Sequence, residues 1–203
     1  MERRDFIKAG VMGLGALAIA DKSMALEYYP KKSDKKWAVI YSTWCGSSRD
    51  AGVWISEGLG GIADVFDVRE NPDPSKYDNI VVGGSIRMGK VSQEMQDYLA
   101  KNKSQLKSKV RGLFAVCGNG EKPVGPTQKA TLIDNHLAKL CEVSKVSSSV
   151  FNGRITQSLM EPDIAKMMKD SYPRIAGKKL ADYDLLKRSA CLAFGKEILD
   201  SVK

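Results

Sequence analysis

The chain has 203 residues, of which 43% are hydrophobic and 28% charged, and its formal net charge is +8. This length suits one globular domain with its own core, and no internal repeat or low-complexity segment indicates a solenoid or a disordered protein. The lysines are spread along the chain without interleaved aromatic residues, which argues against nucleic-acid binding. This distribution is typical of lysines on solvated helix faces. The alternatives are that they dock the protein to an acidic redox partner or to anionic lipid.

The first 25 residues are typical of an export signal. Arg3 and Arg4 precede an apolar, small-residue run over 9–20, and Ser23-Met24-Ala25 offers a small-x-small cleavage site. The pattern resembles the signal of the bacterial twin-arginine (Tat) pathway, which exports folded proteins, many with a cofactor inserted in the cytoplasm. The apolar run is shorter than the roughly 20 residues that span a bilayer, although uncleaved anchoring is an alternative. We therefore expect a periplasmic protein with a signal peptide, a linker and one domain, at residues 1–25, 26–35 and 36–203.

Beyond the linker, short apolar runs alternate with amphipathic segments. The runs are rich in β-branched and aromatic residues and are separated by turn chemistry such as Asn71-Pro72-Asp73-Pro74, so they predict strands. Strands are expected at 36–42, 62–68, 78–85, 111–117 and 143–151, and helices at 48–59, 92–102, 128–140 and 183–202. This alternation predicts an α/β fold with a parallel sheet covered on both faces, whose ligands bind at the carboxyl ends of the strands.

The loop between the first strand and the first helix is rich in hydroxyl groups. Its residues are Ser42, Thr43, Trp44, Cys45, Gly46, Ser47 and Ser48. Backbone N–H groups in a tight turn at a helix N-terminus, with hydroxyl donors nearby, suit a phosphate dianion. The loop matches neither the Walker pattern nor the GxGxxG dinucleotide pattern. An N-capped turn that binds no ligand is the alternative interpretation.

This loop resembles the phosphate loop of flavodoxins, and closely the S-T-x-x-G-x-S/T form of flavodoxin-like (menaquinone-dependent) protoporphyrinogen dehydrogenases. Residues 77–90 extend the resemblance, because YDNIVVGGSIRMGK is similar to that family's Y-D-x-V/I-V/I-V/I-G-A/G-S-I-R-Y-G. Met88 stands where the family has a tyrosine, and the similarity covers residues 36–125 before it weakens. It implies a flavodoxin-like three-layer sandwich, a five-stranded parallel sheet of order 2-1-3-4-5, and one noncovalently bound FMN.

The resemblance also implies a role for each loop. Residues 42–48 would hold the FMN phosphate, and the loops after the third and fourth strands would lie on either side of the isoalloxazine ring. Backbone groups there bias the redox states of a flavin. Trp44 is a candidate for stacking on the ring or covering the ribityl chain, while Arg87 would favour the anionic reduced flavin or else face solvent. The residues of the two flavin loops are Ser85, Ile86, Arg87, Met88 and Gly89, and Cys117, Gly118, Asn119 and Gly120.

The cysteines and the single histidine predict no site of their own. Cys45, Cys117, Cys141 and Cys191 lie far apart without CxxC or CxxCH spacing, which argues against iron–sulfur, zinc and covalent haem sites. They are expected to be mostly buried thiols, with one disulfide formed after export as an alternative. His136 is expected at the surface, and no residue cluster has metal-ligand spacing. Any chemistry therefore belongs to a cofactor.

The segment 154–182 carries apolar residues at near-helical spacing, which are Met160, Ile164, Met167, Met168 and Tyr172. Such a stripe is typical of a helix that faces the core. The alternative is a flexible, methionine-rich cover over the flavin or a surface for a partner.

Together these features predict an exported flavodoxin-like FMN protein that acts as a periplasmic oxidoreductase on a quinone or another organic substrate. The alternatives are a one-partner electron carrier, which docks through charge complementarity, and a binding module without flavin. The periplasm opposes protoporphyrinogen as the substrate, because haem precursors are processed at the cytoplasmic side. The expected partners are a redox protein or a quinone, the twin-arginine translocase during export, and an anionic membrane surface.

Overall fold

The computed structural model describes residues 30–118 and 126–202. The predicted export signal, Asn119 and Gly120 therefore lie outside the described residues. The chain divides into a unit of residues 1–31 and a unit of residues 32–203, and every element below belongs to the second unit. Within the described ranges, no helix combines the length and the apolar character that a membrane crossing requires.

One parallel sheet of five strands forms the centre of this unit. Its strands are β1 Trp37–Ser42, β2 Ala63–Asp67, β3 Asn79–Ile86, β4 Val110–Cys117 and β5 Ser147–Asn152. Their order is β2-β1-β3-β4-β5, which confirms the predicted topology. The strand expected from residue 143 begins only at Ser147, because Glu142 and Lys145 have left-handed backbone conformations that no strand accommodates.

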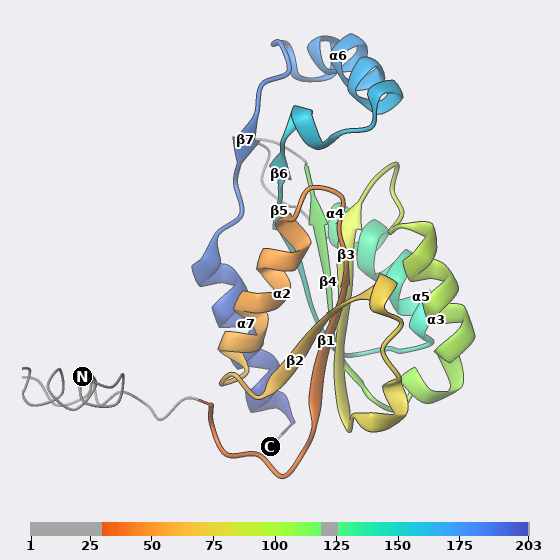
Figure 1. Ribbon diagram of the computed structural model, residues 1–203, viewed down its shortest axis with the longest axis vertical. Coiled ribbons are helices and arrows are strands. Elements are labelled where there is room, and N and C mark those ends of the chain that lie inside the picture. The colour runs from red at the N-terminus through yellow and green to blue at the C-terminus, as the bar shows by residue number, and fades with distance from the viewer. Residues whose placement is uncertain (1–29, 119–125, 203) are drawn as a thin grey trace, which may run out of the picture. The chain divides into compact units, whose positions relative to one another are not determined.

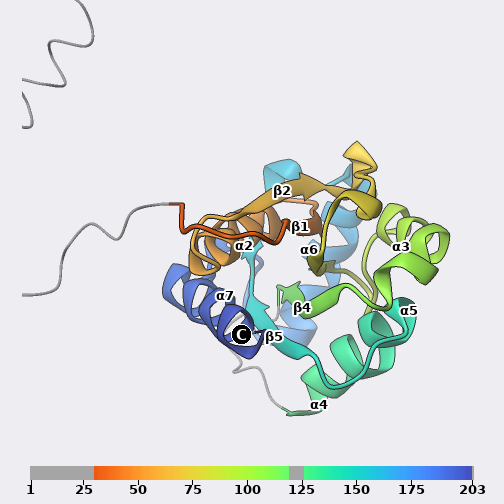
Figure 2. The same ribbon diagram turned by 90° about the horizontal axis from the view of Figure 1, so that it is seen from below.

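Helices cover both faces of the sheet (Figures 1 and 2). One face carries α2 Ser47–Gly58 and α7 Arg188–Ser201. The other face carries α3 Gln93–Leu106 and a second helix, which consists of α4 Pro126–Lys129, η3 Ala130–Leu137 and α5 Ala138–Cys141. The middle part of this second helix, η3, has the wider turns of a π-helix. Side chains alternate between two cores, as the pleat of a strand requires. Val39 and Val81 pack toward α2 and α7, whereas Ile40 and Val82 pack toward α3 and α5.

Short 3-10 turns, η1 Val68–Glu70 and η2 Pro74–Lys76, connect β2 to β3. Asp67 caps η1 by accepting from the Arg69 N–H at 3.0 Å, and Asp73 caps η2 by accepting from the Ser75 N–H at 2.9 Å. These caps explain how a turn rich in proline and asparagine ends one strand and starts the next.

Between β5 and α7 the chain leaves the sheet. β6 Arg154–Ile155 and β7 Tyr183–Asp184 pair as an antiparallel stem, and residues 156–182 between them, called the insertion below, contain η4 Gln157–Leu159 and α6 Pro162–Ala176. The helix expected from residue 183 begins only at Arg188, because Tyr183 and Asp184 pair with β6.

The insertion lies beyond the carboxyl end of the sheet (Figure 1). None of the side chains of α6 whose exposure is described is buried. The prediction of a stripe that faces the core is therefore wrong for this segment. Its apolar residues contribute instead to a pocket outside the two cores.

Candidate functional site

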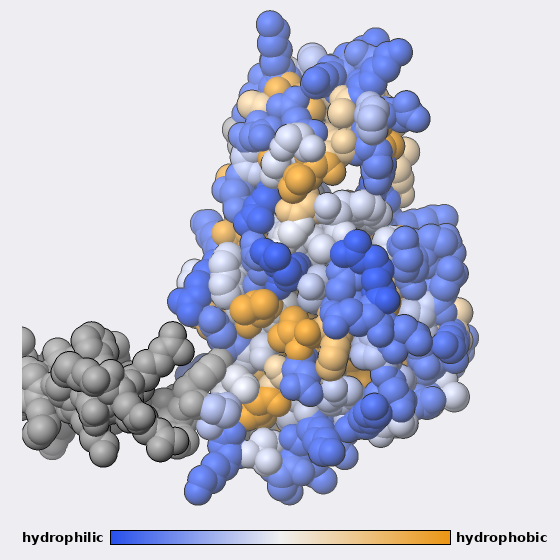
Figure 3. Space-filling model, in the orientation of Figure 1, coloured by the Kyte–Doolittle hydropathy of each residue, from blue (hydrophilic) through white to orange (hydrophobic). Residues whose placement is uncertain are grey.

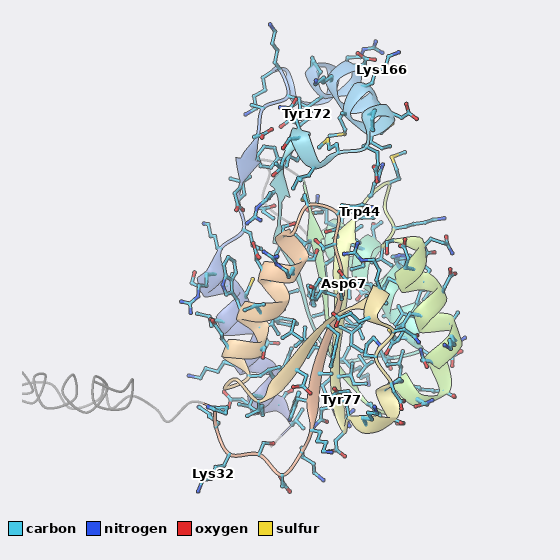
Figure 4. All side chains as sticks on the ribbon, in the orientation of Figure 1. Lys32, Trp44, Asp67, Tyr77, Lys166 and Tyr172 are labelled. Carbon is cyan, nitrogen blue, oxygen red and sulfur yellow. The ribbon has the colours of Figure 1, made fainter. Side chains whose placement is uncertain are left out.

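A pocket of about 260 Å³ lies at the carboxyl edge of the sheet, close in size to the smaller of known ligand pockets, which start near 300 Å³. The predicted loops line it with Trp44, Cys45, Ser47, Ser85, Ile86, Arg87, Met88 and Gly118. Figure 4 shows Trp44 at this edge, below the insertion that carries Lys166 and Tyr172. The structure therefore brings together loops that lie far apart in the sequence.

A second pocket of about 360 Å³ adjoins the first and shares Ile86, Met88 and Gly118 with it. Gly89 and Cys117 line this second pocket, together with residues of α4 and η3. Every described residue of the two predicted flavin loops thus lines one pocket or both. Of the other predicted residues, Ser42, Thr43, Gly46 and Ser48 line neither pocket.

The predicted phosphate loop is a tight turn that starts α2. Gly46 has φ +83°, and its N–H donates to Thr43 Oγ1 at 3.0 Å. Its carbonyl accepts the first helical hydrogen bond, from the Asp50 N–H at 3.1 Å. The N–H groups of the first helical turn, which begins at Ser47, have no acceptor within the helix. The loop therefore presents helix N-terminal donors beside the pocket, as anion binding requires.

Buried hydroxyl groups connect this loop to the flavin loop after β3. The Oγ atoms of Ser48 and Ser85 are 2.6 Å apart in a buried hydrogen bond. Three buried side-chain atoms of the described residues lack a hydrogen-bond partner, and they are Ser42 Oγ, Gln128 Oε1 and Asn152 Oδ1. Ser42 ends β1 and Asn152 ends β5 at the carboxyl edge of the sheet, with β3 and β4 between them, and Gln128 lines the second pocket. Unpaired buried polar atoms at one edge fit a polar ligand such as FMN.

Arg87 does not point freely into solvent. Its Cζ atom lies 5.4 Å from the centroid of the Trp44 ring, a cation–π geometry, and its Nη2 donates to Glu161 Oε2 at 2.8 Å. The hydrogen bond from Arg87 lowers the pKa of the Glu161 carboxyl. The interpretation of Arg87 as a solvated surface residue is therefore wrong: the guanidinium joins the flavin loop to the start of the insertion.

The turn that carries Arg87 is held at both ends. Arg87 and Lys90 exchange two backbone hydrogen bonds of 2.9 and 3.1 Å, and Met88 at the tip has φ +51° and is 82% exposed. The next residue, Val91, donates its N–H to Nε2 of His136 at 3.0 Å. Burial, with a smaller contribution from Lys90, lowers the pKa of His136. This histidine is half-buried and supports the flavin loop, so the expectation of a plain surface residue is wrong.

The four cysteines form no disulfide. Cys117, Cys141 and Cys191 are buried, as expected, and burial raises the pKa of the Cys141 and Cys191 thiols to about 12. Cys45 is half-buried, and its Sγ donates to the Arg154 carbonyl at 3.3 Å. Within the described part of the chain, no group of histidine, cysteine and acidic residues is arranged to hold a metal ion.

Arg154 is a residue of this site that no sequence motif pointed to. Its Nε and Nη2 donate to Asp184 Oδ2 at 2.9 and 2.7 Å, and Nη2 also donates to Asp50 Oδ2 at 2.8 Å. It lines the first pocket next to the loop that begins α2. A signal existed, because Gly153-Arg154 directly follows β5 and so had to lie at the same sheet edge as the other loops.

The insertion supplies the apolar side of the first pocket. Its residues there are Leu159, Met160, Ile164, Met167 and Met168. Leu159 and Met167 are 59% and 38% exposed, so they lie at the rim. Figure 3 shows apolar surface within and beneath the insertion, with further apolar patches lower on the same face. The alternative interpretation of this stripe, a cover over the site, agrees with the geometry.

Comparisons with known proteins agree with this architecture. A family model described as flavodoxin domain matches residues 38–177. The chain is 30% identical over 93 residues to protoporphyrinogen IX dehydrogenase (quinone) of Escherichia coli strain K12, which covers 43% of this chain and 51% of the relative. The chain thus matches about half the length of the curated relatives.

Flavodoxins are among the solved structures that align with this chain. A short-chain flavodoxin associated with a non-canonical bacterial microcompartment aligns with a TM-score of 0.50 at 15% identity, over 83% of this chain and 99% of that one. Oxidised flavodoxin 1 from Bacillus cereus aligns with a TM-score of 0.47 at 14% identity, over 83% and 99%. The family match supports FMN as the cofactor. Because that match runs from β1 to the end of α6, the chain belongs to the flavodoxin domain family and is a flavodoxin-like flavoprotein with a redox function.

Proposed function

We propose that the protein is an FMN-dependent oxidoreductase that acts on a quinone or a similar apolar organic molecule. The observation that carries the proposal is the insertion, which places Met160, Ile164, Met167 and Met168 on the pocket formed by the flavin loops. A one-partner electron carrier needs an open flavin edge where a protein docks. Here apolar side chains of α6 line the pocket in which that edge would lie.

The two sides of the pocket differ in their chemistry. The loops after β1 and β3 provide hydroxyl groups and the guanidinium of Arg87, which suit a phosphorylated cofactor. The insertion provides thioether and aliphatic groups, which adapt to flat apolar molecules and exclude water. When bound, FMN supplies the electron transfer, and the residues of this chain bind and orient the cofactor and its reaction partner.

The name of the Escherichia coli relative includes a quinone, which supports this class of substrate. The match covers about half of that relative, so its other substrate is not part of the proposal. Export by the twin-arginine translocase and a periplasmic location are part of it, supported by the arginine pair and the apolar run of residues 1–25. A periplasmic quinone reductase would meet its substrate at the membrane surface, where the excess of positive charge favours anionic lipid.

The visible spectrum of protein folded in the cytoplasm is the first test. We expect flavin absorbance, or its appearance after FMN is added. Reduced protein should then be reoxidised faster in stopped-flow experiments by a water-soluble quinone analogue than by an acidic haem protein. A protein that binds no FMN would contradict both redox functions, and faster reoxidation by the haem protein would favour the carrier.

A substitution in the cover tests the proposed pocket directly. Met168→Glu should slow reoxidation by the quinone by about tenfold or more, because a carboxylate in an apolar pocket opposes an apolar substrate. FMN affinity should stay unchanged. Val53→Glu is the matched control, since Val53 is a 41% exposed apolar residue of α2 that does not line the pocket. Equal rates in both variants would contradict a substrate site under the insertion.

The proposed location has its own test. Cell fractionation should find the full-length chain in the periplasm, and replacement of Arg3 and Arg4 by lysine should retain it in the cytoplasm. Periplasmic protein from the lysine variant would contradict twin-arginine export.

A further inference from the structure

Arg154 occupies the junction of three parts of the molecule. It begins β6, the first strand of the stem under the insertion, and its guanidinium reaches across to Asp50 in the first turn of α2. The same guanidinium is bound to Asp184 of β7. The backbone also contacts the loop that begins α2, because the Arg154 carbonyl accepts from Cys45 Sγ at 3.3 Å. One residue thus connects the predicted phosphate loop, α2 and both strands of the stem.

The pairing of Arg154 leaves one edge of the guanidinium available. Nε and Nη2 are used by the two carboxylates, whereas Nη1 has no hydrogen-bond partner among the described residues. Nη1 lies beside Gly46, since a Cβ atom built on that glycine would be 3.6 Å from it. The side chain is 24% exposed and lines the first pocket. Two N–H donors of a fixed cation are therefore held next to the helix N-terminus.

We propose that Arg154 recognises the phosphate group of the cofactor, and that Asp50 and Asp184 fix its guanidinium for this task. The 42–48 loop by itself offers only neutral donors, and Asp50 places a negative charge within the first turn of α2. A positive charge beside this helix end lessens the repulsion between a bound dianion and that carboxylate. Arg49 also pairs with Asp50 at 3.2 Å, but its side chain is 62% exposed and does not line the pocket.

The geometry also explains why the residue is arginine. A guanidinium presents donors on more than one edge, so it keeps its two carboxylate partners while Nη1 binds another acceptor. A side chain that is already fixed loses little conformational freedom when the ligand arrives. The inference rests on the assignment of residues 42–48 to the FMN phosphate, and it makes phosphate recognition depend on a residue outside that loop.

The test compares FMN with riboflavin, which lacks the phosphate. Both are titrated against the apoprotein by flavin fluorescence, with and without inorganic phosphate as a competitor. We expect Arg154→Gln to weaken FMN binding by about tenfold or more while riboflavin binding changes little. Arg154→Lys should lose part of the FMN affinity, because the charge stays but the fork of donors is lost.

Two controls separate recognition from support of the fold. Asp184→Asn keeps the cation, Asp50 and an amide oxygen that can still accept from the guanidinium, so FMN affinity should fall much less than in Arg154→Gln. Arg188→Gln removes a 2.6 Å ion pair with Glu57 elsewhere on α2, and it should change neither affinity. If Arg154→Gln does not fold, the ratio of FMN to riboflavin affinity in Arg154→Lys decides.

The outcomes are distinguishable. Equal weakening of FMN and riboflavin binding, or the same loss in Asp184→Asn as in Arg154→Gln, would show a structural role and overturn the inference alone. A wild-type protein that binds riboflavin as tightly as FMN would do the same. A wild-type protein that binds neither flavin would overturn the cofactor assignment, and this inference with it.

Discussion

The parallel sheet and the insertion are built on opposite principles. In β3 and β4 nearly every side chain is buried, while in α6 none of the described side chains is. The sheet is held by apolar packing in two cores, whereas the insertion and its β6–β7 stem make polar contacts with the rest of the molecule. Among these contacts are the Arg87–Glu161 and Arg154–Asp50 ion pairs and the hydrogen bond from the Tyr183 hydroxyl to the Gly118 carbonyl at 2.8 Å.

This difference places rigidity on one side of the pocket and adaptability on the other. The loops that would bind FMN end strands of a packed sheet, so their positions are fixed by the cores. The described residues of α6 include no buried side chain, so we expect the insertion to open at a lower free-energy cost than the sheet. The fixed loops suit a cofactor that stays bound, and the adaptable insertion suits a substrate that must enter and leave.

The largest difference should appear in stability. Phe114 is completely buried in β4, with its ring centroid 6.4 Å from that of Phe151, and Phe114→Ala should lower the free energy of unfolding by about 3–5 kcal/mol. Met167→Ala in the insertion should change it by no more than about 0.5 kcal/mol, because the side chain is 38% exposed. Urea unfolding measures both, and similar losses would show that the insertion is part of the core.

Two glycines with the same backbone conformation, one in each region, test which region determines FMN affinity. Gly46 has φ +83° in the predicted phosphate loop, and Gly177 has φ +70° at the end of α6. A left-handed conformation costs a non-glycine residue about 1–2 kcal/mol, so Gly46→Val should weaken FMN binding by about tenfold. Gly177→Val carries the same strain and should leave FMN affinity unchanged. Fluorescence titration decides, and unchanged affinity in Gly46→Val would reject the phosphate-loop assignment.

The Arg87–Glu161 ion pair crosses from one region to the other. Glu161→Gln should raise the reduction potential of bound FMN, because the guanidinium of Arg87 is no longer neutralised and favours the anionic reduced flavin. It should also make the insertion more sensitive to limited proteolysis. Glu57→Gln, which breaks the Arg188 pair between α2 and α7, is the control for potentiometry. An unchanged potential in Glu161→Gln would show that Arg87 does not act on the flavin.

The smallest expected effect is on the pH dependence of stability, through His136 of η3, which packs on the sheet. In the folded protein, burial lowers the pKa of His136 below its ordinary value of 6.5. As the pH falls, the unfolded chain therefore binds a proton at this residue before the folded protein does. The free energy of unfolding should therefore decline below about pH 6.5, as protonation of Nε2 removes the bond from the Val91 N–H. His136→Gln should flatten this part of the pH profile in urea unfolding. An identical slope in both proteins would assign the pH dependence to other groups.

Local sequence patterns predicted most of the sheet and the residues at its carboxyl edge. The strand at 37–42 is an unbroken apolar run, and the loop at 42–48 contains its own turn glycine and hydroxyl groups. Such features act within a few residues, so they can be read without knowledge of the fold. The assignment of individual residues to FMN stays a prediction, as do the signal peptide and the periplasmic location.

The sequence by itself determined the order of strands and helices, the two cores and the position of the site loops, because burial and turn chemistry are encoded locally. Only the tertiary structure decided that α6 covers the pocket, that His136 supports the flavin loop and that Arg154 reaches the start of α2. Each depends on a contact between distant segments, such as the pairing of residues 154–155 with 183–184. An amphipathic pattern shows that a helix has an apolar face, and the packing of the whole chain decides what that face meets.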